Sequence, residues 1–239
     1  MRFSQFSSYA KDIARNQGLS WLLKTGASHF AYFLYYKKIR KCPQSFTFLD
    51  KRYDYFVAMY HATYANERAV EIPIAMGLVE KYLGRRILEV GNVLSHYFSF
   101  PHVIVDKYEV APGVTNEDIV EYSTRQKFDL VLSISTLEHV GWDETPQDGT
   151  KIIKALKNIK NLVNPGGLVM VTVPIGQNPL LDKLIREGII KFDRQYYMKR
   201  ISKSNLWEQK GWDSVNSCRS GDPFPGANAI IVGYDLNGV

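Results

Sequence analysis

Cysteine is scarce in this chain, and uninterrupted apolar runs long enough to span a membrane are missing. Cys42 and Cys218 are the two cysteines among 239 residues, and their spacing matches neither a metal-ligand pattern nor a redox motif. They give no reason to expect an oxidising compartment. There is also no internal repeat and no low-complexity tract, which leaves an ordinary globular protein as the class to expect.

Composition and charge support that class. Hydrophobic residues make up 45% of the chain and charged residues 23%, and the length suits one sizeable domain with an appendage. The net charge of +6 is uneven, because residues 1–52 hold ten Lys or Arg against two Asp. The rest is slightly acidic, which disfavours a nucleic-acid groove in the core domain. The basic segment suggests an anionic partner of its own.

Apolar side chains recur at spacings of three and four over residues 19–34, which predicts an amphipathic helix followed by a basic stretch. A transmembrane helix needs about 20 mainly apolar residues, and Lys24 and His29 interrupt this one. Lys24 also disfavours a signal peptide. The helix then packs on protein or lies in a membrane interface. We expect residues 1–65 to be a basic, aromatic-rich helical segment, with residues 18–41 as the candidate membrane contact.

From residue 66 onward, apolar strands alternate with helical stretches. We expect strands over 87–90, 102–106, 128–134, 168–173 and 229–234, and helices over 74–82, 147–163 and 180–188. The continuous apolar run 128–134 is typical of a strand that is buried on both faces. The alternation predicts an α/β domain over residues 66–239 with a mainly parallel central sheet. Residues 192–212 are left unassigned.

Two acidic residues end successive predicted strands. Glu89 and Gly91 close the first strand, and Asp106 closes the second. Gly91 suits a sharp exit, because glycine tolerates positive φ and allows close approach to a ligand. In open α/β sheets ligands bind at the carboxyl ends of strands where the strand order reverses. We therefore expect a crevice at Gly91, with Glu89 on its rim.

The order of these pieces resembles the class I S-adenosylmethionine-dependent methyltransferase family over residues 66–235. The most specific parts are "FDLVLSISTLEHVGWDE" and "NPGGLVMVTVP", which follow the two acid-ended strands. "NERAVEIP", ahead of the first strand, resembles a narrower subgroup of bacterial and archaeal methyltransferase-like proteins. The resemblance implies a Rossmann-like methyltransferase fold and S-adenosylmethionine as the cofactor.

The resemblance also implies cofactor-binding roles for seven residues: Glu89, Gly91, Asn92, Asp106, Asp118, Ser135 and Thr136. Glu89 and Gly91 would hold the methionine end, and Ser135 and Thr136 would lie beside the sulfonium and the acceptor. Asp106 would accept hydrogen bonds from the ribose hydroxyls, since a carboxylate offers two acceptor oxygens. Asp118 falls near the acid that reads the adenine amino group.

Methyl transfer is an in-line displacement in which the protein mostly supplies proximity and orientation. A hydroxyl acceptor calls for a general base, and histidine is the commonest choice. His139, just past a cofactor-facing strand end, is the catalytic candidate; the alternative is that Glu138 and His139 open a helix and make structural hydrogen bonds. His96 and His61 are further candidates. No second ligand pair supports a metal site.

Two functions compete. The first is a cytoplasmic methyltransferase that methylates an oxygen of a small molecule or glycan. In one version of this function the enzyme also lies at a membrane surface. The second is a non-catalytic binding or scaffold protein. The family's glycine-rich loop has glycines at alternate positions, and here these are Gly91, Val93 and Ser95, which favours the scaffold. The acids at the strand ends favour the enzyme.

Overall fold

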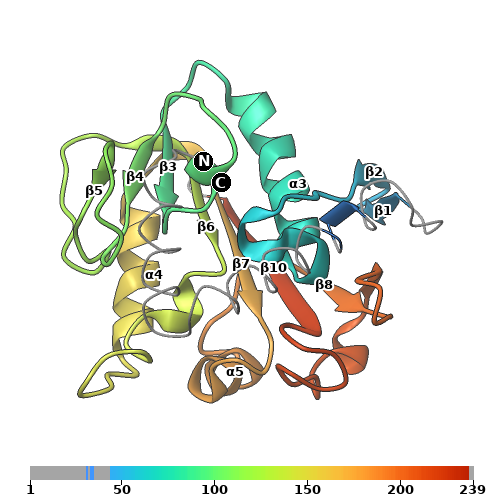
Figure 1. Ribbon diagram of the computed structural model, residues 1–239. Coiled ribbons are helices and arrows are strands. Elements are labelled where there is room, and N and C mark those ends of the chain that lie inside the picture. Colours follow the sequence, from blue (N-terminus) through green and yellow to red (C-terminus); the bar gives the residue numbers. More distant parts are fainter. Residues whose placement is uncertain (1–30, 32, 35–43, 237–239) are drawn as a thin grey trace, which may run out of the picture.

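The computed structural model describes residues 31, 33, 34 and 44–236, and one eight-stranded sheet runs through this part of the chain (Figure 1). Its order is β5-β4-β3-β6-β7-β10-β8-β9. The strands are β3 Ile87–Val90, β4 Val103–Val105, β5 Val114–Thr115, β6 Phe128–Ile134, β7 Val163–Pro174, β8 Arg194–Arg200, β9 Trp207–Lys210 and β10 Ala229–Leu236. All pairings from β5 to β7 are parallel, and the remaining three are antiparallel. The predicted α/β class with a mainly parallel central sheet is confirmed.

The sheet is covered on both faces (Figure 1). Helices α4 (Lys151–Asn161) and α5 (Pro179–Arg186) share one apolar core with Leu88 and Val90 of β3. Helix α3 (Arg68–Val79) shares the opposite core with Ile87. Successive side chains of a strand point to opposite faces, so one short apolar strand supplies both cores.

Helix α3 begins six residues earlier than the sequence predicts and contains Pro73 in its interior. Proline has no N–H, so the carbonyl of Ala69, four residues before it, loses its helical partner. The Phe56 N–H donates to that carbonyl at 2.9 Å. Because a loop residue supplies the missing hydrogen bond, the helix continues through the proline and Arg68 and Glu71 join its first turn.

Other boundaries differ less. Helix α4 is shorter at both ends than predicted, and β7 begins at Val163, before the expected break. The unassigned region 192–212 contains β8 and β9 at the far edge of the sheet. Short 3₁₀ turns complete the fold: η2 Tyr60–Ala65, η3 Glu80–Tyr82, η4 Leu94–His96, η5 Leu137–His139 and η6 Trp212–Ser214.

The segment 1–65 is only partly described. The predicted helix over 18–41 lies outside the described residues except for 31, 33 and 34, which are helical. Residues 45–54 form a hairpin of β1 (Ser45–Phe48) and β2 (Lys51–Asp54), where the sequence predicts helix. Its apolar residues alternate, and the two residues of its turn both have positive φ, as tight hairpins require. The domain boundary at residue 65 stays a prediction.

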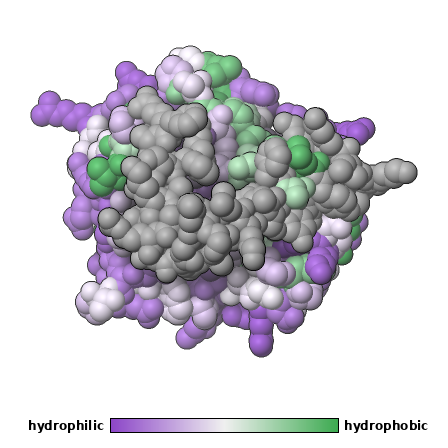
Figure 2. Space-filling view, viewed as in Figure 1, coloured by the Kyte–Doolittle hydropathy of each residue, from purple (hydrophilic) through white to green (hydrophobic). Residues whose placement is uncertain are grey.

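The described surface in the view of Figure 2 is mostly hydrophilic, with hydrophobic residues in separate small patches. The large apolar side chains that are exposed include Leu83, Tyr108, Val110 and Ile189. Scattered apolar residues of this kind are ordinary on a folded protein. Across the described ranges, every helix falls short of the length and hydropathy needed to cross a membrane.

Candidate cofactor and active site

A cavity of about 330 Å³ lies at the carboxyl ends of the parallel strands. From β3 the chain runs outward to β4 and β5 and then returns to β6 on the other side of β3, so the strand order reverses here. Open α/β sheets bind ligands at this point. Seven of the eight predicted site residues line the cavity: Gly91, Asn92, Asp106, Asp118, Ser135, Thr136 and His139. The structure therefore brings together strand ends that are up to 48 residues apart in the sequence.

Glu89 lies beneath the loop that follows β3. Its side chain is fully buried, so the expectation that it lies on the rim is wrong. One carboxylate oxygen accepts the N–H groups of Val93 (3.0 Å) and Leu94 (2.7 Å), and the other lies 2.9 Å from His102 Nε2. Burial alone would lower the pKa of His102, but the Glu89 carboxylate and the Phe100 carbonyl raise it. These contacts hold the loop in place although its second and third family glycines are absent.

Gly91 and Asn92 tie this loop to the neighbouring strand. Gly91 has φ +85°, the left-handed conformation that favours glycine, and its N–H donates to the Val105 carbonyl at 2.9 Å. The Asn92 N–H donates to Asp106 Oδ2 at 2.9 Å. The side-chain oxygen Oδ1 of Asn92 accepts a hydrogen bond from the Ser95 hydroxyl. These hydrogen bonds fix the loop beside the cavity, which Gly91 and Asn92 both line.

Asp106 organises the loop after β4. Its Oδ1 accepts the N–H groups of Tyr108 (2.9 Å) and Glu109 (2.8 Å), in addition to the Asn92 N–H on Oδ2. A carboxylate has about four acceptor positions, so roughly one stays free for a ligand. The sequence predicted an acid at this place, but it did not indicate that the acid also holds two loops.

Asp118 lies in an ion network that sequence reasoning missed. Its Oδ2 is 3.0 Å from Lys107 Nζ and 2.6 Å from Lys151 Nζ, and both lysines also contact Glu144. Burial would raise the pKa of Asp118, but Lys151, the Val120 N–H and Lys107 lower it overall. The four charged residues come from separate loops and the start of α4, so no local motif signals them.

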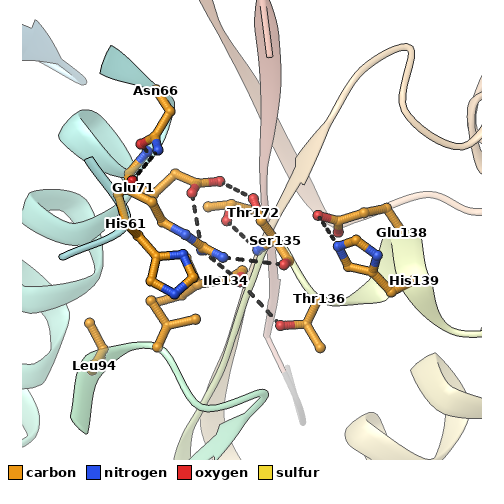
Figure 3. Close-up of polar contacts among 12 residues, drawn as sticks. His61, Asn66, Glu71, Leu94, Ile134, Ser135, Thr136, Glu138, His139 and Thr172 are labelled. Atoms are coloured by element: carbon orange, nitrogen blue, oxygen red, sulfur yellow. Dashed lines mark hydrogen bonds and ion pairs between the residues drawn. The ribbon is translucent and has the colours of Figure 1, made fainter. Parts of the chain in front are cut away.

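Ser135, directly after β6, has φ +40° and uses each of its polar groups. Its N–H donates to Thr172, its hydroxyl donates to Glu71 Oε1 at 2.5 Å, and its carbonyl accepts Arg68 Nη2 at 3.5 Å. Figure 3 shows these contacts converging at the end of β6. A left-handed backbone at a non-glycine residue persists where the surroundings fix it. Ser135 therefore has a structural task in addition to its predicted place at the site.

Arg68 and Glu71 are the members of "NERAVEIP" that brace this turn. Arg68 Nη1 donates to the Ile134 carbonyl at 2.8 Å and to Glu71 Oε2 at 3.3 Å. Glu71 is fully buried, and burial raises its pKa while Arg68 opposes that shift. Arg68 also lines the cavity and was missed as a site residue. The motif itself was a usable signal, because a charged cluster ahead of a site strand can pair across the mouth of the crevice.

His139 is the part of η5 that reaches the cavity. Its Nδ1 lies 2.6 Å from Asp143 Oδ2, and its Nε2 lies 3.7 Å from Glu138 Oε1. Glu138 is buried, and burial raises its pKa well above the usual range. Asp143, which also lines the cavity, was not predicted. No local pattern signals this pair, because a turn after η5 brings the two side chains together.

His61 and His96 lie together in an aromatic group outside the cavity lining. Their rings lie 4.3 and 4.7 Å from the Tyr60 ring, and His96 Nε2 is 3.1 Å from Glu109. Burial, Arg68 and His96 lower the pKa of His61. In Figure 3, Thr136 lies between His61 and His139. A role for His61 at the acceptor stays a prediction.

No protein-family model matches this chain, and no curated protein matches it in sequence. Its fold is similar to that of the N-methyltransferase NodS from Bradyrhizobium japonicum WM9 in complex with S-adenosyl-L-homocysteine. That pair has 12% identity and a TM-score of 0.46, covering 72% of this chain and 87% of NodS.

Two further solved structures are similar at comparably low sequence identity. An S-adenosylmethionine-dependent methyltransferase from Clostridium acetobutylicum ATCC 824 has 13% identity and a TM-score of 0.37, covering 69% of this chain and 89% of its own. The sugar N-methyltransferase KedS8 from Streptoalloteichus sp ATCC 53650 has 11% identity and a TM-score of 0.36, covering 72% and 88%. Likeness at this identity concerns the fold alone.

Proposed function

We propose that this protein is an S-adenosylmethionine-dependent methyltransferase that methylates an oxygen of a small molecule or glycan. One observation carries the proposal: six of the seven residues to which the sequence resemblance gives cofactor roles line one cavity at the reversal point of the sheet, and the seventh, Glu89, holds the loop beside it. Its volume of about 330 Å³ lies within the range of small-molecule sites.

The donors and acceptors at the cavity fit this cofactor. Arg68 offers guanidinium N–H groups for the methionine carboxylate, and the Gly91–Asn92 loop would hold the same end. Asp106 keeps about one acceptor position for a ribose hydroxyl. At the adenine end, Asp118 already forms ion pairs with two lysines. The adenine amino group would donate a further hydrogen bond to this carboxylate. When bound, the cofactor supplies a methyl group on a positively charged sulfur.

The chain's own contribution to the transfer is placement and proton removal. Thr136 and His139 lie on the same cavity, so an acceptor beside them would meet the methyl group and a base together. A hydroxyl must lose its proton as it is methylated, and His139 is the base that we propose. The cytoplasm, with contact of residues 18–41 to a membrane surface, is the location that we propose.

The scaffold interpretation keeps two observations in its favour. Val93 and Ser95 replace the family glycines, and Asp118 already has two cationic partners. The two functions differ in one measurable property, which is affinity for the cofactor. Titration calorimetry of the full chain with S-adenosylmethionine and S-adenosylhomocysteine separates them.

We expect the wild type to bind both, and Asp106→Ala to weaken binding at least about tenfold. A hydrogen bond to a charged group contributes about 1.5–3 kcal/mol, and 1.4 kcal/mol is one decade. Asp129→Ala is the matched control. That carboxylate also accepts a backbone N–H, from Arg86 at 3.0 Å, but it is the second residue of β6 and so lies at the opposite end of the strands from the cavity. Absence of heat for the wild type at millimolar cofactor would establish the scaffold instead.

A further inference from the structure

The turn after η5 brings Asp143 back onto His139. The His139 carbonyl accepts the N–H groups of Trp142 (3.1 Å) and Asp143 (3.2 Å). Gly141 within the turn has φ +71°, and a Cβ there would lie 2.0 Å from the Asp148 carbonyl oxygen, so only glycine fits. The Asp148 N–H donates back to the Gly141 carbonyl at 2.9 Å. The backbone therefore builds the pairing of the two side chains.

The two ring nitrogens of His139 have different surroundings. Nδ1 lies 2.6 Å from the Asp143 carboxylate, whereas Nε2 lies 3.7 Å from Glu138, beyond a hydrogen bond. Glu138 is 1% exposed, and its Oε2 has no hydrogen-bond partner among the described residues. Glu71, Arg68 and Glu67 are the charged groups that act on it, and two of the three are acidic.

The surroundings of Glu138 disfavour a negative charge on it. Burial and the acidic neighbours raise its pKa, although its own backbone N–H and Arg68 oppose that shift. Glu138 is also the more distant carboxyl group, at 3.7 Å from the ring against 2.6 Å for Asp143. Within the described part of the chain, Asp143 is therefore the carboxylate at hydrogen-bond distance from His139.

We propose that Asp143 is the positioning residue that fixes the tautomer of His139. The proposal rests on the proposed methyl transfer to oxygen. By accepting the Nδ1–H, Asp143 leaves the lone pair on Nε2. As the acceptor oxygen bonds to the methyl carbon, the carbon–sulfur bond breaks and its electron pair stays on sulfur. The hydroxyl proton passes to Nε2, and the Asp143 carboxylate stabilises the imidazolium that forms.

The tautomer can be read by nuclear magnetic resonance of the full chain with ¹⁵N-labelled histidines, without cofactor or acceptor. The chain has five histidines, and His139→Gln assigns the relevant signals. We expect the neutral His139 ring to carry its proton on Nδ1 in the wild type and to lose this preference in Asp143→Ala. Exposed ion pairs contribute little to stability, so this variant should fold.

Glu144→Ala is the matched control. Glu144 is the adjacent carboxylate and lines the same cavity, but its partners are Lys107, Lys151 and, at 3.4 Å, the Gly141 N–H, and not the His139 ring. Its removal should leave the Nδ1–H signal in place, and Asp143→Glu should restore part of it. A wild-type ring protonated on Nε2, or an Asp143→Ala ring that keeps its proton on Nδ1, would overturn the proposal.

Failure of the proposed function gives a different result. If calorimetry detects no cofactor binding while the Nδ1–H signal is present, methyl transfer is refuted and the pairing stands without a catalytic purpose. With an acceptor in hand, Asp143→Ala should lower kcat and leave the affinity for S-adenosylmethionine unchanged. A fall in cofactor affinity alone would assign Asp143 to binding and overturn its role as a positioning residue.

Discussion

Gly91 lies directly against Thr136 at the point where the strand order reverses. A Cβ built on Gly91 would come within 2.1 Å of Thr136 Oγ1 and 2.8 Å of its Cγ2. The sequence suggested that this glycine leaves room for a ligand, yet the room next to it is taken by a side chain of the neighbouring strand end. The glycine is therefore required by close approach and by its φ of +85°, even before a ligand binds.

Gly91→Ala should destabilise the protein more than Gly113→Ala. Gly113 has φ +86°, but a Cβ there meets nothing within 4 Å, so it isolates the cost of the backbone conformation. That conformation costs about 1–2 kcal/mol, and overpacking against Thr136 adds about 1–3 kcal/mol. Urea unfolding of both variants measures the difference. Equal losses would mean that Thr136 moves aside freely, and the steric argument would fail.

At Ser135 we expect the glycine variant to be more stable than the alanine variant, which is the reverse of the usual order. Ser135→Ala and Ser135→Gly both lose the hydroxyl bond to Glu71, but only glycine relieves φ +40°. Relief of about 1–2 kcal/mol exceeds the entropic cost of glycine, about 0.5–1 kcal/mol. We expect Ser135→Gly to be the more stable variant in urea unfolding.

Ser133 provides the control for that pair. It is buried in β6, two residues earlier, and its φ is negative. Its hydroxyl has no partner among the described residues. Ser133→Ala should therefore be more stable than Ser133→Gly. The same order at both positions would show that the Ser135 backbone is not strained.

Glu89 and His102 predict a pH dependence of stability. The pKa of His102 is raised above its unfolded value of 6.5, chiefly because Glu89 outweighs the lowering effect of burial. The stabilisation is therefore fully present below pH 6.5 and is lost as the pH rises through the folded-state pKa. His102→Gln keeps a donor for Glu89 but does not titrate.

The free energy of unfolding, measured in urea from pH 5.5 to 8.5, should fall more steeply with pH for the wild type than for His102→Gln. His102→Ala should cost about 3–5 kcal/mol, since it removes one partner of a buried pair. Parallel pH profiles for the wild type and His102→Gln would contradict the ion pair.

Residue patterns predicted the sheet well, because burial on both faces leaves a local signature. Strands β3 and β6 occupy 87–90 and 128–134, as the apolar runs indicated. The start of α3 could not be predicted, because its passage through Pro73 depends on a hydrogen bond from Phe56, which lies outside the helix. Local patterns identify elements, and long-range partners decide their limits.

The candidate site shows the same division. The position of Asp106 on the cavity follows from the end of a parallel strand, and that of Asp118 was implied by the family resemblance. Their partners do not, since two lysines, Lys107 and Lys151, reach Asp118 from a loop and from α4. The burial of Glu89 was not predicted either, because the residues of β3 do not indicate that the following loop folds back over this side chain.

The concentration of positive charge in residues 1–52 predicts that the segment before β1 is dispensable for folding and is the part that meets a membrane. Among the described residues, both apolar cores are formed from Phe46 onward, and we expect deletion of residues 1–41 to leave a cooperatively unfolding protein. Loss of that cooperative transition would show that the deleted segment belongs to the core.

Membrane contact through residues 18–41 should depend on charge and therefore on salt. Each Lys or Arg near an anionic surface contributes about 1 kcal/mol, and the attraction is screened within a Debye length. The full chain should sediment with anionic liposomes, less so as salt is added, and deletion of residues 1–41 should abolish sedimentation. Substituting Lys37, Lys38, Arg40 and Lys41 by Gln keeps the apolar face of the predicted helix and removes its charge. If this variant sediments like the wild type, or if neutral liposomes recover as much protein as anionic ones, the basic stretch does not direct the protein to a membrane, and the segment is better explained by packing on protein.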